Sequence, residues 1–287
     1  MAGDYQLVPL ANGTTTLYSA SYGEKMHPGL GPRAEAELLY IRQLKIRERL
    51  AATTGEFVIW DVGLGGAANA IALLEATKEI AGALRIVSFD NTAEPLEFAL
   101  KNAAALNYPA GYKNQIAPLL RSGKATFQNQ NCSVTWEFHL EDFPSLLANL
   151  RLKTGSLKIP GPHAIFYDAF SPAKNPAMWT LPVFTELFQA LDPQRPCALT
   201  TYSRSTLLRT TLLLAGFCVG VGHATGMKEE TTIAANRMDL ILEPLGKRWL
   251  ERALRSDSAE PLNQPVYSRR KLAPETAAAL QQHWQFQ

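Results

Sequence analysis

The chain has 287 residues, of which 46% are hydrophobic and 19% charged, with a net charge of +2 and a pI of about 8.4. This composition excludes extensive disorder and predicts a folded protein with a substantial core. The mild basicity permits a nucleic-acid partner without arguing for one.

The sequence predicts a cytoplasmic protein without a membrane partner. The first ten residues lack the basic and then apolar pattern of a signal peptide, and no apolar run reaches the roughly 18 residues that a membrane span needs. Cys132, Cys197 and Cys218 have neither metal-ligand nor redox spacing. We therefore expect no disulfide framework and no metal site.

Residues 1–52 are predicted to form an extension made of a hairpin, a loop and a helix. Tyr5–Leu10 and Thr15–Tyr18 flank an Asn-Gly turn, which is a strong hairpin signal. Ser19–Pro32 is rich in Gly and Pro and is expected to be a loop. Apolar side chains on one face of Arg33–Leu50 predict a helix.

Short apolar runs then alternate with helical segments, which predicts a doubly wound α/β domain over residues 53–245. Seven strands are expected: Phe57–Trp60, Leu84–Phe89, Val134–His139, Ala164–Tyr167, Ala198–Tyr202, Phe217–Val221 and Thr231–Ala235. The helices expected between them include Ala67–Ile80, Ala93–Leu106, Gln115–Ser122, Pro144–Leu150 and Leu181–Leu191. Only a short loop separates the last two strands, so one antiparallel strand is expected at the sheet edge. Residues 246–287 are expected to form a helical tail whose role the pattern does not indicate.

A glycine-rich turn follows the first of these strands directly and precedes a helix, with glycines at Gly63, Gly65 and Gly66. Such a turn lets a ligand approach the backbone and the helix N-terminus. Asp61 completes a D-x-G-x-G arrangement, which is typical of methyltransferases, where the acid meets the positively charged methionine end of S-adenosylmethionine. A dinucleotide site has no such need, because its loop must cradle a pyrophosphate.

Further acids follow the next two strands. Asp90 ends the second strand, where a carboxylate accepts hydrogen bonds from ribose hydroxyls, although an NAD site would place one there as well. Glu141 and Asp142 follow the third strand and are expected to meet the adenine amino group. Ligands of open sheets bind at the carboxyl ends of strands, so these acids and the glycine turn predict an S-adenosylmethionine site.

The run after the fourth strand is much more specific. Asp168–Thr180 reads D-A-F-S-P-A-K-N-P-A-M-W-T. It closely resembles the D-[AG]-F-x-P-x-K-N-P-x-M-W-T signature of the methyltransferase half of the bacterial bifunctional tRNA enzyme MnmC and of its stand-alone relatives, MnmD. Tyr22–His27 and Gly226–Glu229 resemble two further segments of this family, over roughly Tyr18–Ala235. The resemblance implies a class I (Rossmann-like) methyltransferase with helices on both faces of a mostly parallel sheet.

The resemblance also implies a reaction: methyl transfer from S-adenosylmethionine to the amine of 5-aminomethyl-2-thiouridine at the tRNA wobble position. Asp168 would orient the amine and help to remove its proton, and Phe170 would stack on the extruded base. The other candidate residues are Met178 and Trp179 to close the pocket, Glu24 toward the cofactor and His27 toward the substrate, and Lys174, Arg204 and Lys228 for tRNA phosphates.

The sequence departs from the family in two places. Gly63–Ala67 lacks the common G-x-G-T-G pattern, and no second G-x-G-x-x-G follows Ala235, so no flavin-dependent half and no FAD are expected. Cys197 follows a proline, as the nucleophile of carbon methyltransferases often does. It precedes its strand, at the opposite edge of the sheet from the glycine turn, so we expect it to be buried and inert.

Two other interpretations remain open. One is a methyltransferase of the same fold that acts on a different amine. The other is an NAD-binding or non-catalytic Rossmann module, against which Asp61 and the predicted terminal hairpin argue.

Overall fold

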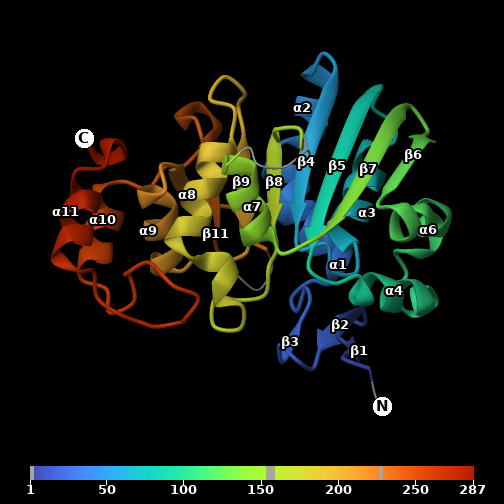
Figure 1. Ribbon diagram of the computed structural model, residues 1–287, viewed down its shortest axis with the longest axis horizontal. Helices are drawn as coiled ribbons and strands as arrows, with labels where there is room; N and C mark the ends of the chain where they lie inside the picture. The colour runs from blue at the N-terminus through green and yellow to red at the C-terminus, as the bar shows by residue number, and fades with distance from the viewer. Residues whose placement is uncertain (1–2, 153–158, 226–228) are drawn as a thin grey trace.

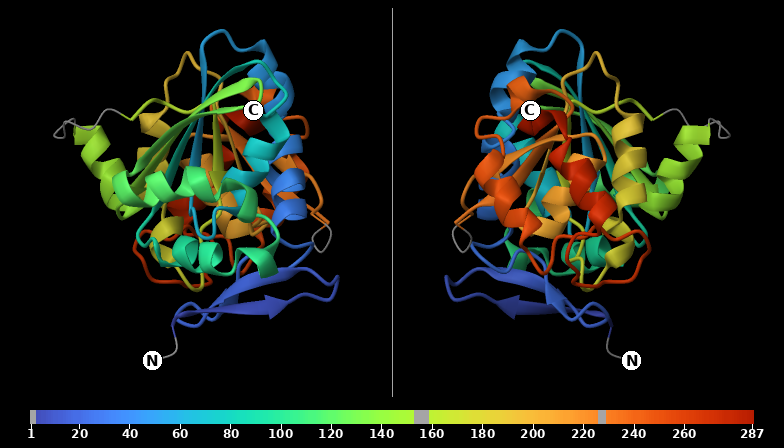
Figure 2. Two further views of the ribbon diagram at one scale, coloured as in Figure 1. Left: turned by 90° about the vertical axis from the view of Figure 1, so that its right-hand side faces the viewer. Right: turned by 90° about the vertical axis from the view of Figure 1, so that its left-hand side faces the viewer.

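The computed structural model of the chain describes residues 3–152, 159–225 and 229–287. A small antiparallel sheet at the N-terminus precedes a large α/β domain (Figure 1). The small sheet consists of β1 (Tyr5–Pro9), β2 (Thr15–Ser19) and β3 (Glu24–Lys25). Its first two strands form the expected hairpin, with Pro9 opposite Thr15. Figure 2 shows this sheet as a separate layer against one edge of the large domain.

The large sheet has the strand order β10-β11-β9-β8-β4-β5-β7-β6. Its strands are β4 (Glu56–Val62), β5 (Gly82–Asp90), β6 (Lys124–Asn129), β7 (Cys132–Leu140), β8 (Ala164–Tyr167), β9 (Ala198–Thr201), β10 (Cys218–Gly222) and β11 (Thr231–Ala235). Strands β4, β5, β7, β8 and β9 are parallel, so their carboxyl ends share one edge of the sheet. The expected class I architecture and each of the expected strands are confirmed.

The expected number of seven strands is wrong, because β6 is an eighth. It pairs antiparallel with β7, and its alternate side chains Lys124, Thr126 and Gln128 are exposed, so its apolar pattern is too weak to predict a strand. At the other side of the sheet, the antiparallel strand does not lie at the edge, contrary to expectation. Strand β11 is antiparallel to both β9 and β10 and lies between them, so the edge strand β10 runs in the direction of β9.

Helices cover both faces of the large sheet (Figures 1 and 2). On one face lie α1 (Pro32–Ala36), the π-helical turn η1 (Glu37–Arg42), α2 (Ile46–Ala52), α3 (Ala68–Thr77), α4 (Glu94–Lys101), α5 (Ala103–Leu106) and α6 (Lys113–Ser122). On the other lie α7 (Phe143–Leu152), α8 (Leu181–Ala190), α9 (Thr206–Leu214), α10 (Lys247–Leu254) and α11 (Pro274–Gln281). Side chains alternate between the two faces of the sheet along β4, so this strand contributes to a hydrophobic core on each face. Phe57 and Ile59 pack on the first face, and Val58 and Trp60 on the second.

Two expected helices are interrupted. The helix predicted over Arg33–Leu50 is divided by η1 and by Lys45, whose φ of 50° ends one helical piece before α2 begins. The π-helical turn is followed by Gln43, whose Oε1 accepts hydrogen bonds from the backbone N–H of His223 and the hydroxyl of Thr231, so the interruption fastens this segment to the far end of the sheet. The helix predicted over Ala93–Leu106 is likewise divided at Asn102 into α4 and α5.

The tail forms helical pieces around a loop, as expected, and it packs onto the domain. Trp249 of α10 and Leu280 of α11 are buried among the side chains of the second face. Within the described part of the chain, no helix is long and apolar enough to cross a membrane.

Candidate active site

A cavity of about 590 Å³ opens at the edge where the parallel strands end. Such volumes are typical of small-ligand sites, and the carboxyl edge is where open α/β sheets bind ligands. The segment after β2 covers the cavity from the side of the small sheet. Most predicted site residues line it: Glu24, His27, Gly63, Gly65, Gly66, Asp90, Glu141, Asp142, Asp168, Phe170 and Met178.

The glycine turn brings the ends of three strands together. Gly63 has a φ of 92°, and a Cβ at this position would stand 2.8 Å from the backbone oxygen of Asp168, so only glycine fits. The backbone N–H of Gly65 donates to Oδ2 of Asp90 over 2.9 Å. Ala67 adopts a left-handed φ of 62° directly before α3.

Asp90 keeps its predicted place at the end of β5, facing the cavity. Burial raises its pKa, while the backbone N–H groups of Gly65 and Thr92 act in the opposite direction. Asp142 also lines the cavity, but its Oδ2 accepts from the N–H and the hydroxyl of Ser145 at the start of α7, so that oxygen caps a helix. Glu141 is exposed at the cavity rim.

Asp61 lies behind the cavity and does not line it, contrary to the prediction that it meets the cofactor. Its side chain is 1% exposed, Oδ2 accepts from the Ser88 hydroxyl, and Oδ1 has no hydrogen-bond partner among the described residues. Trp136 Nε1 in turn donates to Ser88 Oγ. The pKa of Asp61 is raised to about 7, mainly by burial and to a smaller extent by the charges of Asp168 and Asp90, against the opposing effect of the Ser88 hydrogen bond.

Asp168 follows β8 and lies at the centre of the site. Its Oδ2 accepts a 2.7 Å hydrogen bond from Nδ2 of Asn69, in the first turn of α3. Nδ1 of His27 lies 3.9 Å from this oxygen and 3.9 Å from Oε2 of Glu35. Burial raises the pKa of Glu35, whose Oε1 also accepts from the backbone N–H groups of Gly29 and Leu30 and so holds the His27 loop in shape.

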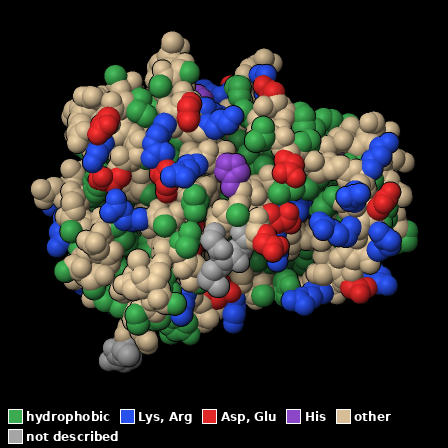
Figure 3. Space-filling view, turned by 180° about the vertical axis from the view of Figure 1, so that it is seen from behind, with side chains coloured by type: hydrophobic (Ala, Val, Ile, Leu, Met, Phe, Trp, Pro, Cys, Tyr) green, Lys and Arg blue, Asp and Glu red, His purple; other side chains and the backbone are tan. Residues whose placement is uncertain are grey.

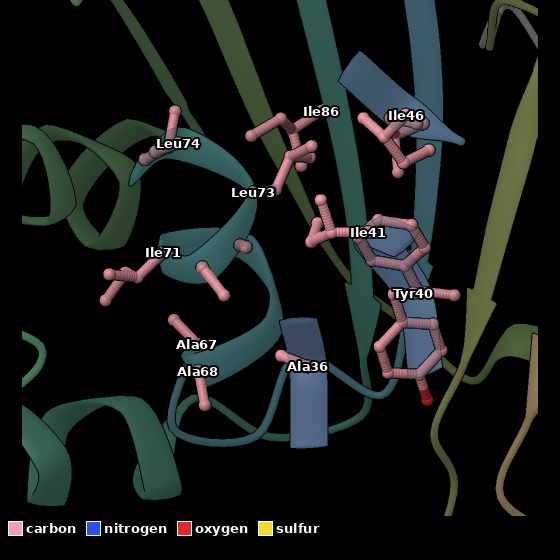
Figure 4. Close-up of a cluster of buried hydrophobic side chains, with 14 of the residues drawn as sticks. Ala36, Tyr40, Ile41, Ile46, Ala67, Ala68, Ile71, Leu73, Leu74 and Ile86 are labelled. Atoms are coloured by element: carbon pink, nitrogen blue, oxygen red, sulfur yellow. The ribbon is translucent and has the colours of Figure 1, made fainter. Parts of the chain in front are cut away.

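Glu35, Tyr40 and Asn69 are functional candidates that the sequence did not single out, because each lies in a segment with an ordinary helical pattern. Tyr40 is 1% exposed, lines the cavity from η1, and its hydroxyl has no hydrogen-bond partner among the described residues. Burial, and next the charge of the nearby Asp168 carboxylate, raise its pKa well above the usual range. Figure 4 shows the hydroxyl directed away from Ile41 and Ile46. An unpaired buried hydroxyl at a cavity wall is available to a ligand.

The signature run meets the small sheet across the cavity. Tyr22 stacks on Phe170 with 4.1 Å between ring centroids. Glu24 accepts hydrogen bonds from the N–H and the hydroxyl of Ser171, so its carboxylate fastens β3 to this run. Trp179 does not close the pocket as predicted: it is fully buried, and its Nε1 donates to the backbone oxygen of Phe170 from behind.

The predicted phosphate contacts lie outside the cavity or outside the described residues. Lys174 is exposed and does not line the cavity, and Arg204 lies 3.7 Å from Glu229 on the surface. Lys228 falls outside the described residues. Cys197 is 1% exposed at the amino end of β9, and burial raises its pKa to about 12, which fits the expected inert thiol. Among the described side chains, none form a group of three or more that could hold a metal ion.

Comparisons with known proteins agree with this geometry. A protein family described as S-adenosyl-L-methionine-dependent methyltransferase matches residues 119–237. The chain is 30% identical over 224 residues to the tRNA 5-methylaminomethyl-2-thiouridine biosynthesis bifunctional protein MnmC of Ectopseudomonas mendocina, covering 73% of this chain and 32% of that protein. It is 26% identical to the MnmC protein of Cupriavidus metallidurans, covering 79% and 33%. The chain thus spans about a third of the length of these relatives.

Solved structures show the same fold. MNMC2 from Aquifex aeolicus superposes with a TM-score of 0.68 at 21% identity, covering 98% of this chain and 83% of that one. A spermidine synthase superposes with a TM-score of 0.54 at 11% identity, covering 96% and 80%. Fold, site and family together define a class I S-adenosylmethionine-dependent methyltransferase. Within that class, the chain carries an MnmC methyltransferase-like domain.

The chemistry of the residues that line the cavity fits S-adenosylmethionine. The cationic or titratable basic side chains on the cavity wall are only those of Lys25 and His27 among the described residues, whereas six carboxylates line it: Glu24, Glu35, Asp90, Glu141, Asp142 and Asp168. An acidic, partly desolvated wall favours a positively charged ligand such as a sulfonium. The glycine turn leaves the backbone open to close approach, and the Asp90 carboxylate retains lone pairs for hydroxyl groups.

The raised pKa of Asp61 predicts a pH dependence of stability. An acid with a higher pKa in the folded state contributes its full stability below the unfolded pKa of about 4, and this contribution declines as the pH rises toward the folded pKa. Asp61→Asn cannot ionise. We therefore expect the free energy of unfolding of the variant, relative to that of the wild type, to increase as the pH rises from about 4 to 7. Denaturant unfolding across this range, without S-adenosylmethionine, measures the difference.

Asp257→Asn is a matched control, because Asp257 is 85% exposed on the surface. Its effect should stay small and nearly constant over the same pH range. A constant difference for Asp61→Asn as well would show that the pKa of Asp61 is not raised in the folded protein.

Proposed function

We propose that the protein methylates the amino group of 5-aminomethyl-2-thiouridine at the tRNA wobble position, with S-adenosylmethionine as donor. The observation that carries the proposal is the Asp168 carboxylate, held by Asn69 beside the glycine turn in an acidic cavity. The MnmC proteins are named for the biosynthesis of 5-methylaminomethyl-2-thiouridine, the product of this reaction.

The acidic wall suits the acceptor. A primary alkyl amine is protonated at neutral pH, so the carboxylates attract it as a cation. Nitrogen attacks only as the neutral amine, so one proton must leave before transfer; the product forms as a secondary ammonium ion, which stays protonated at neutral pH. Asp168 is placed to accept a hydrogen bond from the amine and to take up a proton, and His27, 3.9 Å away, is placed to pass it on.

The remaining work is positioning. When bound, S-adenosylmethionine supplies an electrophilic methyl group; the side chains of this chain align the amine with it and exclude water. Asp168 fixes the direction of the amine, and the unpaired Tyr40 hydroxyl offers a second polar contact at the wall.

Aromatic groups at the cavity suit a base lifted out of its stack. Phe170 lines the cavity, and Met178 lies beside it. Enzymes that modify bases hold the extruded base against aromatic or apolar side chains. Tyr22 occupies one face of Phe170, so the base takes the place of Tyr22 or extends the stack.

Labelled methyl transfer tests the proposal directly. The purified chain is incubated with labelled S-adenosylmethionine and tRNA that carries unmethylated 5-aminomethyl-2-thiouridine, and the modified nucleoside is analysed. Label in that nucleoside supports the proposal. Transfer to a small amine such as a polyamine but not to tRNA would favour the alternative that another amine is the substrate, and binding of NAD without S-adenosylmethionine would favour a dehydrogenase-like module.

Asp168→Ala should lower single-turnover methylation by roughly 100-fold or more, the contribution typical of a positioned acid–base group. Its affinity for S-adenosylmethionine should change little, because other residues form the predicted cofactor contacts. Asp168→Asn should be intermediate, since the amide keeps an acceptor oxygen but loses the charge. The measurement is single-turnover transfer to hypomodified tRNA at saturating cofactor, with cofactor affinity measured by calorimetry. Wild-type transfer by the alanine variant would remove Asp168 from the mechanism.

Tyr40→Phe should separate activity from stability. The variant keeps the ring, which stacks on Phe166 with 4.6 Å between centroids, and removes only a buried hydroxyl, which lies near the Asp168 carboxylate without a hydrogen bond of good geometry. We expect unfolding free energy to stay equal or rise by about 1 kcal/mol, while methyl transfer falls by about tenfold. Thermal unfolding and single-turnover assays measure the two effects. Full activity in a stable variant would show that no ligand uses the hydroxyl.

A further inference from the structure

The positive charge of the chain is concentrated in its tail. Residues 246–287 carry seven Lys and Arg against four Asp and Glu, a net charge of +3. The whole chain has 28 Lys and Arg against 26 Asp and Glu, so residues 1–245 carry 21 against 22, a net charge of −1. The part of the chain that forms the cavity therefore has no net attraction for a polyanion.

The cavity itself repels phosphate. Carboxylates dominate its wall, from the small sheet at Glu24 to the end of β8 at Asp168. An RNA that presents an amine to this wall brings its own phosphodiester charges close to these acids. Binding then requires cationic side chains near the cavity mouth but outside the cavity.

The tail contacts the end of the signature run. Between α10 and α11 the chain descends to the edge where the parallel strands end (Figure 1). There Leu262 forms a parallel bridge with Thr180, and its backbone oxygen accepts from the N–H of Leu181. Thr180 follows η3 (Pro176–Trp179), whose Met178 lines the cavity.

A basic loop, Arg269–Lys271, lies beside this contact in a fixed conformation. The backbone oxygen of Arg270 accepts from the N–H groups of Ala259 and Glu260, shortly before Leu262. The Glu260 side chain is 8% exposed and accepts from the N–H of Ala273 and the hydroxyl of Thr276. This buried carboxylate links the segment before the basic loop to the segment after it, so an ordered backbone presents the basic side chains.

The basic side chains of the loop are available to a ligand. Arg269 and Arg270 are exposed, and Nε of Arg269 donates to the hydroxyl of its neighbour Tyr267. Lys271 pairs with Asp257, but both side chains are at least 75% exposed, and such pairs exchange readily for another anion. Lys and Arg side chains also gather on the side of the molecule formed by the C-terminal helices, at the right of Figure 3.

We propose that the basic loop Arg269–Lys271 binds the phosphodiester backbone of the RNA whose amine enters the cavity. The inference rests on the proposed function and adds to it a second contact site, contributed by the tail. Two guanidinium groups suit phosphate, because their planar donors match its oxygens in pairs. The contact positions the RNA without reading its sequence.

The test compares two double variants of the full chain that remove the same charge. Arg269→Gln/Arg270→Gln changes the basic loop, and Lys113→Gln/Arg121→Gln changes exposed residues of α6, which lies on the opposite side of the molecule (Figure 1). Binding of hypomodified tRNA is measured by fluorescence anisotropy over a range of salt concentrations. Single-turnover methylation is measured with the same tRNA and with the free 5-aminomethyl-2-thiouridine nucleoside.

The loop variant should bind tRNA about tenfold more weakly at low salt, with the slope of log Kd against log salt reduced by about 1 for each lost contact. The α6 variant should match the wild type. Methylation of the nucleoside, and of tRNA at saturating concentration, should be unchanged in both variants.

Equal tRNA affinity and equal salt slope in the loop variant and the wild type would overturn the inference. A loss of binding to anionic phosphatidylserine vesicles, with tRNA affinity kept, would overturn it too and assign the loop to a membrane surface. The two proposals fail separately. If the wild type methylates no tRNA, the proposed function fails, whereas the anisotropy comparison still decides whether the basic loop binds RNA.

Discussion

The contact between the Gly63 turn and the backbone of Asp168 governs the geometry of the whole site. A Cβ at position 63 would stand 2.8 Å from the Asp168 carbonyl oxygen, and the Asp168 N–H donates to the backbone of Val62 over 2.9 Å. The Asn69 side chain then joins α3 to the Asp168 carboxylate. The turn expected to carry the methyl donor and the acid expected to hold the acceptor therefore form one rigid unit, set by the pairing of β4 with β8. Methyl transfer depends on such fixed distances.

The charge of the site follows a second constraint. A sulfonium donor and an ammonium acceptor are both cations, and an acidic wall stabilises both where water is partly excluded. Several carboxylates close together also raise one another's pKa, as the influence of Asp168 and Asp90 on Asp61 illustrates. The same wall disfavours nucleic acid. A protein that binds a small cationic group of a large polyanion needs an acidic pocket for the group and a separate basic surface for the polyanion. The charge of this chain is divided in that way, with +3 in the tail and −1 in the remainder.

The sequence predicts those features that depend on position along a strand. Gly63 and Asp168 each follow a parallel strand and Asp90 ends one, so their shared edge follows from topology, and the structure brings them together. Asp61 lies away from the cavity because side chains alternate along a strand: it continues the face of Ile59 and accepts a hydrogen bond from Ser88, which Trp136 also contacts. Tyr40 could not be predicted, because a π-helical turn inside an apparently regular helix decides where its hydroxyl points.

The small N-terminal sheet is part of the site rather than an appendage to it. Glu24 fastens it to Ser171, and the Tyr22 ring covers Phe170. An aromatic pair of this kind contributes about 0.5–1.5 kcal/mol beyond its buried area, and stacking of a nucleobase on an aromatic side chain contributes about 1–3 kcal/mol. Under the proposed function, exchanging Tyr22 for a base on the Phe170 face is therefore close to neutral or favourable. Under the same proposal, the Tyr22–Phe170 stack covers this face until substrate binds, and the Glu24 contact with Ser171 holds the small sheet in place.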